Sequence, residues 1–131
     1  MHASNSVANT YKNQQIMTAS PEELTLMLYN GAIRFVSESM AALEQKDLEK
    51  AHNTNMRAQD IVREFMNTLN MDYEVSKGYF QLYDYIEFSL IQGNLKNDRA
   101  LLAEAKDMLQ ELRNTWVEAM KLSRQQKAAS S

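Results

Sequence analysis

The stretch Thr18-Ala19-Ser20-Pro21-Glu22-Glu23-Leu24 decides the fold, because it marks the start of a long helix. Ser20 is a strong N-cap residue, and Pro21 suits the first helical position, where a backbone N–H has no intrahelical partner. Glu23 follows Ser20 at the spacing of a capping box. Apolar residues then recur every three or four positions, so the stretch predicts a helix from about residue 20 to residue 46.

Three more helices follow at similar lengths. Asp47 can cap a second helix that reaches about residue 71, a third runs from about residue 75 to 95, and Asn97-Asp98 opens a fourth that continues to about residue 124. Short connections favour antiparallel neighbours. The sequence therefore predicts an all-α, antiparallel up-down-up-down four-helix bundle over residues 18–124. A mobile N-terminal arm or short capping helix, residues 1–17, precedes the bundle, and a disordered polar tail, residues 125–131, follows it.

The composition narrows the class of protein. A chain of 131 residues with 44% apolar residues fits one globular domain. A net charge of −3, with acidic and basic residues interleaved, argues against nucleic-acid binding. Cysteine is absent, no apolar run is long enough to span a membrane, and the first 15 residues are polar. We therefore expect a cytoplasmic protein without membrane insertion.

No catalytic or metal-binding pattern is complete. Glu49 and His52 have the Glu-x-x-His spacing of a di-metal bundle site, but such a site needs two of these pairs, and the other histidine is His2. No phosphate-binding loop or nucleophile motif occurs. We expect no cofactor, no metal and no enzymatic activity.

The first helix has an unusually wide apolar face. At about 100° per residue, its apolar residues cover an arc of about 200°, whereas a bundle helix needs little more than 100°. We expect Leu24, Leu28, Ala32 and Phe35 to face the core. The other flank would then contact a partner, and its residues are Leu26, Tyr29, Ile33, Val36 and Met40.

The third and second helices carry further candidates. In the third, a core stripe of Val75, Tyr79, Leu82, Tyr83, Ile86 and Leu90 leaves a second set outside it, namely Phe80, Phe88, Ile91 and Leu95. In the second, Asn55 and Gln59 fall within or beside the apolar arc. Their amides either tie the bundle together or line a groove that accepts a guest backbone. The predicted partner-binding residues therefore include Asn55, Gln59, Phe80 and Ile91.

Two classes of function fit this excess of apolar surface. The bundle either binds another polypeptide in hydrophobic grooves, or it is a structural bundle that forms a stable homodimer through the same surface. The fourth helix has a normal arc, so the excess belongs to the first helix and the third.

Several segments in one order and spacing resemble a known family, the flagellin-specific export chaperones of bacteria called FliS. The segments are Tyr11 in the arm, Thr18–Leu24 leading into Met27–Ala32, Ala58-Gln59-Asp60-Ile61, Leu82-Tyr83-Asp84-Tyr85, and Arg113 with Trp116. They extend over nearly the whole chain.

The resemblance implies a partner and a role. A FliS-like bundle would bind the disordered C-terminal segment of newly made flagellin, prevent premature polymerisation and deliver flagellin to the flagellar type III export gate. The N-terminal segment would occupy part of the guest's groove, with Tyr11 as the residue that competes with the guest. Whether another flagellar assembly factor binds the opposite side is left open.

Overall fold

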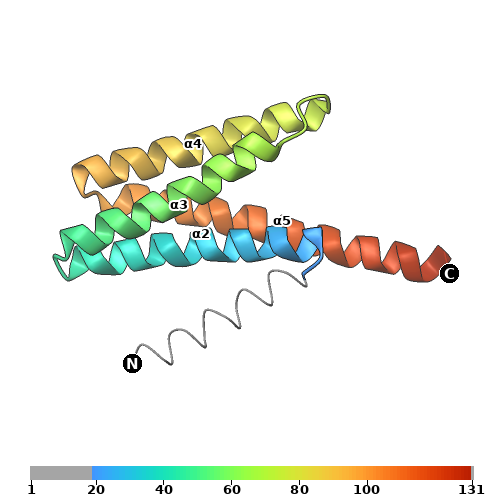
Figure 1. The fold of residues 1–131 in the computed structure, drawn as a ribbon, viewed down its shortest axis with the longest axis horizontal. Helices are drawn as coiled ribbons and strands as arrows, with labels where there is room; N and C mark the ends of the chain where they lie inside the picture. The colour runs from blue at the N-terminus through green and yellow to red at the C-terminus, as the bar shows by residue number, and fades with distance from the viewer. Residues whose placement is uncertain (1–18, 131) are drawn as a thin grey trace.

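The computed structural model describes residues 19–130, which form four helices joined by short turns (Figure 1). The helices are α2 (Pro21–Glu44), α3 (Leu48–Thr68), α4 (Glu74–Lys96) and α5 (Arg99–Ser130). Each helix packs against its neighbours in the chain, and α5 also packs against α2. The predicted antiparallel up-down-up-down bundle is confirmed over this part of the chain.

Helix ends lie where the sequence places capping residues. The Ser20 hydroxyl accepts a hydrogen bond from the Glu23 backbone N–H at 3.2 Å, and Pro21 occupies the first helical position of α2. An Asp47 carboxylate oxygen accepts from the Lys50 N–H at 3.2 Å at the start of α3. Asn97 ends α4 in the left-handed conformation, with φ of 50°, which asparagine tolerates better than most residues. Local sequence therefore sets the boundaries of these helices.

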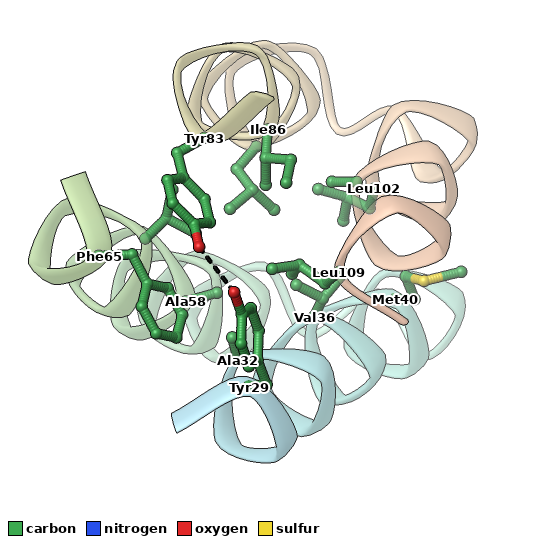
Figure 2. Packing of buried hydrophobic residues seen from close by; sticks show 13 residues of the cluster. Tyr29, Ala32, Val36, Met40, Ala58, Phe65, Tyr83, Ile86, Leu102 and Leu109 are labelled. Atoms are coloured by element: carbon green, nitrogen blue, oxygen red, sulfur yellow. Dashed lines mark hydrogen bonds between the residues drawn. The ribbon is translucent and has the colours of Figure 1, made fainter. Parts of the chain in front are cut away.

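All four helices contribute to one hydrophobic core. Val36, Val62, Ile86 and Leu109, one from each helix, are fully buried, and Val36, Ile86, Leu102 and Leu109 meet in the interior in Figure 2. The core changes in character along the bundle. Aromatic rings from α2, α3 and α4 fill the end near the start of α2, whereas small alanines on α2 and α3 lie further along.

The aromatic end of the bundle is the wider one. In Figure 1, the end of α3 and the start of α4 lie well away from the start of α2 and the adjoining part of α5. Large rings hold neighbouring helices further apart than alanines do. The resulting open end positions one of the candidate sites described below.

Helix α5 is longer than the sequence analysis predicts. Residues 125–130, assigned there to a disordered polar tail, continue the helix to Ser130, and its last turns extend beyond the other helices (Figure 1). Gln, Lys and Ala are good helix formers, and no Gly or Pro interrupts this stretch. The tail assignment is therefore wrong for these residues. The predicted arm, residues 1–17, lies outside the described residues.

Candidate functional site

Exposed large apolar side chains are concentrated on and just before α4. Within residues 19–130, the exceptions are Leu48 and Leu122. The residues that gather there are Met71, Tyr73, Val75, Phe80, Leu82, Tyr85, Phe88 and Leu95. Scattered surface hydrophobes need no explanation, but a contiguous group on one helix marks a binding surface.

The outer face of α4 carries the stripe that the sequence predicts. Phe88 is 58% exposed and Leu95 is 72% exposed, while Phe80 and Ile91 are more covered. Asp84 lies between Phe80 and Phe88 on this face. We call these four apolar residues the α4 outer stripe. It offers apolar contact area beside a carboxylate.

A shallow groove separates the outer stripe from α3. Its walls include Met66 and Asn67 on α3 and Phe80 on α4, around a volume of about 240 Å³. The Arg63 guanidinium crosses the groove to the Glu87 carboxylate, with Nε and Oε2 2.8 Å apart. This ion pair joins α3 to α4 at the surface.

A second groove, the α4–α5 groove, lies on the other side of α4 and encloses about 300 Å³. Tyr79 and Leu82 of α4 face Met108 and Leu112 of α5 across it, and Glu111 and Thr115 complete the lining. The Tyr85 hydroxyl donates to a Glu104 carboxylate oxygen at 2.5 Å, and this bond raises the pKa of Tyr85 because it stabilises the protonated phenol. The α4 wall of the groove is uncharged, whereas the α5 wall carries the Glu111 carboxylate.

A cavity of about 390 Å³, which we call the end cavity, lies at the open end of the bundle. All four helices contribute, and the lining residues are Thr25, Tyr29, Phe65, Thr68, Leu69, Tyr79, Tyr83, Leu112, Thr115, Trp116 and Ala119. Among residues 19–130, no charged side chain belongs to this lining. The cavity therefore suits uncharged apolar groups.

Ring stacking and one hydrogen bond form the floor of the end cavity. Phe65 stacks between Tyr29 and Tyr83, with ring centroids 4.5 Å and 5.3 Å apart. The two tyrosine hydroxyls meet at 2.6 Å (Figure 2), and burial raises the pKa of both. On α5, the Trp116 indole N–H donates to the Glu22 backbone carbonyl at 3.0 Å, as expected for an aromatic residue at the rim of a core. These contacts join all four helices around the cavity.

The prediction for α2 is wrong about which residues face the core. Tyr29, Val36 and Met40 were assigned to a partner-binding flank, but they are buried at 4%, 0% and 8% exposure. The centre of the wide apolar arc faces the core, because α2 packs against both α3 and α5. Both edges of the arc are then partly covered. Tyr29 still reaches the end cavity as part of its floor.

The remaining candidates on α2 and α3 are also covered to differing degrees. Leu26 and Ile33 are partly exposed, and Ile33 packs against the core. Asn55 and Gln59 are buried at 1% and 3% exposure. The Asn55 amide donates to the Leu90 carbonyl at 3.1 Å, and the Gln59 amide donates to the Asn55 side-chain oxygen at 2.7 Å. These amides tie α3 to α4, so they line no open groove.

Two predictions about the core face of α4 are wrong. Val75 and Leu82 were predicted to be core residues but are 64% and 41% exposed. They lie at the edge of α4 that faces α5, where the helices do not close over them. The α4–α5 groove and the end cavity were not predicted from the sequence, although the tyrosines that line them were an available signal. Tyr11 lies outside the described residues.

The described part of the chain exposes apolar surfaces rather than a group of metal ligands. Among residues 19–130, no three histidine, aspartate or glutamate side chains group as metal ligands. No helix in that part of the chain combines the length and hydropathy needed to cross a membrane. What these residues build is an antiparallel four-helix bundle that leaves an apolar helix face, two grooves and an aromatic cavity open to the outside.

Comparison with known proteins identifies the family. The family described as "Flagellar protein FliS" matches residues 3–123. The flagellar secretion chaperone FliS of Bacillus subtilis strain 168 is 37% identical over 120 residues, covering 92% of this chain and 90% of the relative. The Vibrio cholerae chaperone of the same name is 28% identical, covering 79% of this chain and 78% of the relative. This protein belongs to the FliS family of flagellar secretion chaperones.

A solved structure agrees with the fold. A crystal structure described as a flagellar chaperone from bacteria superposes with a TM-score of 0.72, at 19% identity, and covers 87% of this chain and 97% of the other. The predicted resemblance to FliS is thus confirmed by the family match. A chaperone family is not an enzyme class.

Proposed function

We propose that this protein is a cytoplasmic export chaperone that binds the disordered C-terminal segment of flagellin, prevents its premature polymerisation and delivers it to the flagellar type III export gate. One structural observation carries the proposal, namely the group of exposed apolar side chains on and just before α4. Membership of the FliS family of flagellar secretion chaperones supports a guest that the flagellar system exports. An amphipathic guest helix binds such a surface by laying its apolar face against it.

Wrapping a disordered guest suits a chaperone that must later release it. Ordering a disordered segment offsets about 2–5 kcal/mol of the interaction free energy. Specific contacts can then coexist with an affinity low enough for transfer. The α4 outer stripe and the two grooves beside it give separate places for successive guest helices.

The N-terminal residues belong to the same proposal. Residues 1–17 would cover part of the guest's groove, with Tyr11 competing for it, so the fraction of protein competent to bind would be lowered. Deleting residues 1–15 is therefore expected to tighten guest binding, measured by calorimetry. Unchanged or weaker affinity would contradict this part of the proposal.

Calorimetric titration with a flagellin C-terminal peptide tests the main claim, using two matched surface variants. Phe88→Ser removes an exposed ring from the α4 outer stripe and is expected to weaken binding about tenfold or more, as loss of an aromatic anchor does. Leu48→Ser removes a similarly exposed apolar side chain at the start of α3, 54% exposed, and should leave the affinity within about twofold. Thermal unfolding followed by circular dichroism checks that both variants fold.

Three results would contradict the proposal. The first is no binding of the peptide at micromolar concentrations. The second is an equal loss of affinity in both variants. The third is a dimer that light scattering shows to persist on dilution while ignoring flagellin, which would favour the structural homodimer instead.

A further inference from the structure

The α4–α5 groove and the end cavity adjoin each other, and we call them together the track. Tyr79, Leu112 and Thr115 line both hollows. The hydrogen bond between Tyr85 and Glu104 lies one turn of α5 beyond Met108, which lines the groove. From residue 104 to residue 119, this stretch of α5 is about 22 Å long at 1.5 Å per residue, which matches a helix of about 15 residues.

The two walls of this track differ in charge. On α4, Val75, Leu82 and Tyr85 lie along one edge at helical spacing, and all are uncharged and exposed. On α5, Glu104 and Glu111 lie seven residues apart on the edge that faces α4, with Met108 between them. Neither Lys nor Arg belongs to the described lining of the groove.

The Glu111 carboxylate is available to a partner. It makes no ion pair or hydrogen bond within residues 19–130, whereas two other glutamates of α5 each have a partner. Glu118, two turns further along α5, pairs with Lys121 at 3.5 Å, and Glu104 accepts from Tyr85. An unpaired carboxylate at the rim of an apolar groove attracts a cation on whatever fills that groove.

We infer that this track holds an amphipathic helix of the guest with lysine or arginine along the flank that faces α5, and that Glu111 selects for this basic flank. The inference rests on the proposed function, since it places one helix of the guest. The helix would lay its apolar stripe on Leu82, Met108 and Leu112 and end with an apolar side chain in the end cavity. Complementary charge at the rim sets orientation and selectivity, while the apolar floor supplies most of the affinity.

Two model peptides test the charge preference independently of flagellin. Both are amphipathic helices of about 15 residues with the same apolar stripe, one flanked by lysines and the other by glutamates. The full-length protein is expected to bind the lysine peptide about fivefold tighter or more. Added salt should lower the affinity for the lysine peptide and raise the affinity for the glutamate peptide. Equal affinities, or no salt dependence, would overturn the inference.

Matched charge reversals test the role of Glu111. Glu111→Lys should cancel the preference for the lysine peptide, whereas Glu64→Lys, an equal charge change at an exposed position on α3, should preserve it. The same pair is then titrated with the flagellin C-terminal peptide. Equal weakening by both variants would overturn the inference while leaving the proposed function intact. Failure of flagellin to bind the wild-type protein would overturn the proposed function, with the model peptides still deciding the groove's preference.

Cross-linking locates the bound helix. Because the chain contains no cysteine, Thr115→Cys gives a unique thiol at the junction of groove and cavity. A bromoacetyl group on the lysine peptide should react there, and Glu64→Cys should react far less. Equal reaction of the two thiols would overturn the placement of the bound helix in the track. Two other results would overturn the inference by giving the track another occupant. If the charge preference emerges only after deletion of residues 1–15, the occupant is the protein's own N-terminal segment. If Glu111→Lys breaks a dimer, the occupant is a second copy of the chain.

Discussion

The hydroxyl oxygens of Tyr29 and Tyr83 lie 2.6 Å apart in the core, although the two residues come from helices that are diagonal in the bundle (Figure 2). Neighbouring helices are joined by side-chain packing, but this bond spans the interior directly. Both tyrosines are buried, at 4% exposure each. The bond therefore pairs two largely buried polar groups at the floor of the end cavity.

Removing both of these hydroxyls should cost less than the sum of the two single removals. Tyr83→Phe leaves the Tyr29 hydroxyl buried without a partner, which is expected to lower the free energy of unfolding by about 1–3 kcal/mol. The double variant Tyr29→Phe with Tyr83→Phe buries no unpaired hydroxyl, so its loss should be smaller than the sum of the two single losses. Urea denaturation of the wild type, the two single variants and the double variant completes this double-mutant cycle. Strictly additive losses would mean that the two hydroxyls do not interact.

The same pair predicts a loss of stability at alkaline pH. Burial raises the pKa of both phenols above the ordinary value of 10.0, so the folded state holds these protons more tightly than the unfolded state. The stability that these protonated phenols contribute is fully present below pH 10 and is lost as the pH rises through their folded-state pKa values. Urea midpoints measured between about pH 9 and pH 11 should therefore fall. The fall should be smaller in the double phenylalanine variant, and an equal fall would assign it to other groups.

Replacing either of two glycines in α4 by alanine should change stability in opposite directions. At Gly93 in α4, an added Cβ would lie 2.6 Å from Leu102 Cδ2 and 3.3 Å from the Asp98 carbonyl oxygen, so Gly93→Ala is expected to lower the free energy of unfolding by about 1–3 kcal/mol. At Gly78 in the same helix, the added Cβ meets nothing within 4 Å, so Gly78→Ala should raise it by about 0.5–1 kcal/mol. Thermal and urea unfolding measure the free energy of unfolding of both variants. A similar change in the two variants would contradict the packing between α4 and α5.

The buried amide of Asn55 should matter far more than an exposed amide two residues away. Asn55→Ala removes the bond to the Leu90 carbonyl and leaves the Gln59 amide without its acceptor, so a loss of about 1–3 kcal/mol is expected. Asn53→Ala, exposed on the same helix, should change stability by less than about 0.5 kcal/mol. Urea denaturation compares them. Equal effects would mean that the Asn55 network does not tie α3 to α4.

Much of the fold could be read from local sequence, because helix ends depend on nearby residues. Ser20 and Asp47 cap α2 and α3 as their side chains predict, and the polar residues around position 97 separate α4 from α5. The exposed stripe through Phe80, Phe88 and Leu95 could also be predicted, since periodicity places these residues away from the core face of α4. The sequence by itself thus determined the class of fold, the helices and part of the candidate surface.

The tertiary structure alone decided which part of each wide apolar arc is covered. Periodicity gives the angle of each side chain around its own helix, but the directions of the neighbouring helices depend on packing between distant residues. On α2 the two neighbours enclose the centre of the arc, so Val36 and Met40 are buried where a partner surface was predicted. Aromatic rings at one end of the core keep the helices apart there. That spacing leaves Leu82 exposed beside α5 and opens the end cavity, features that depend on contacts between helices rather than on any one segment.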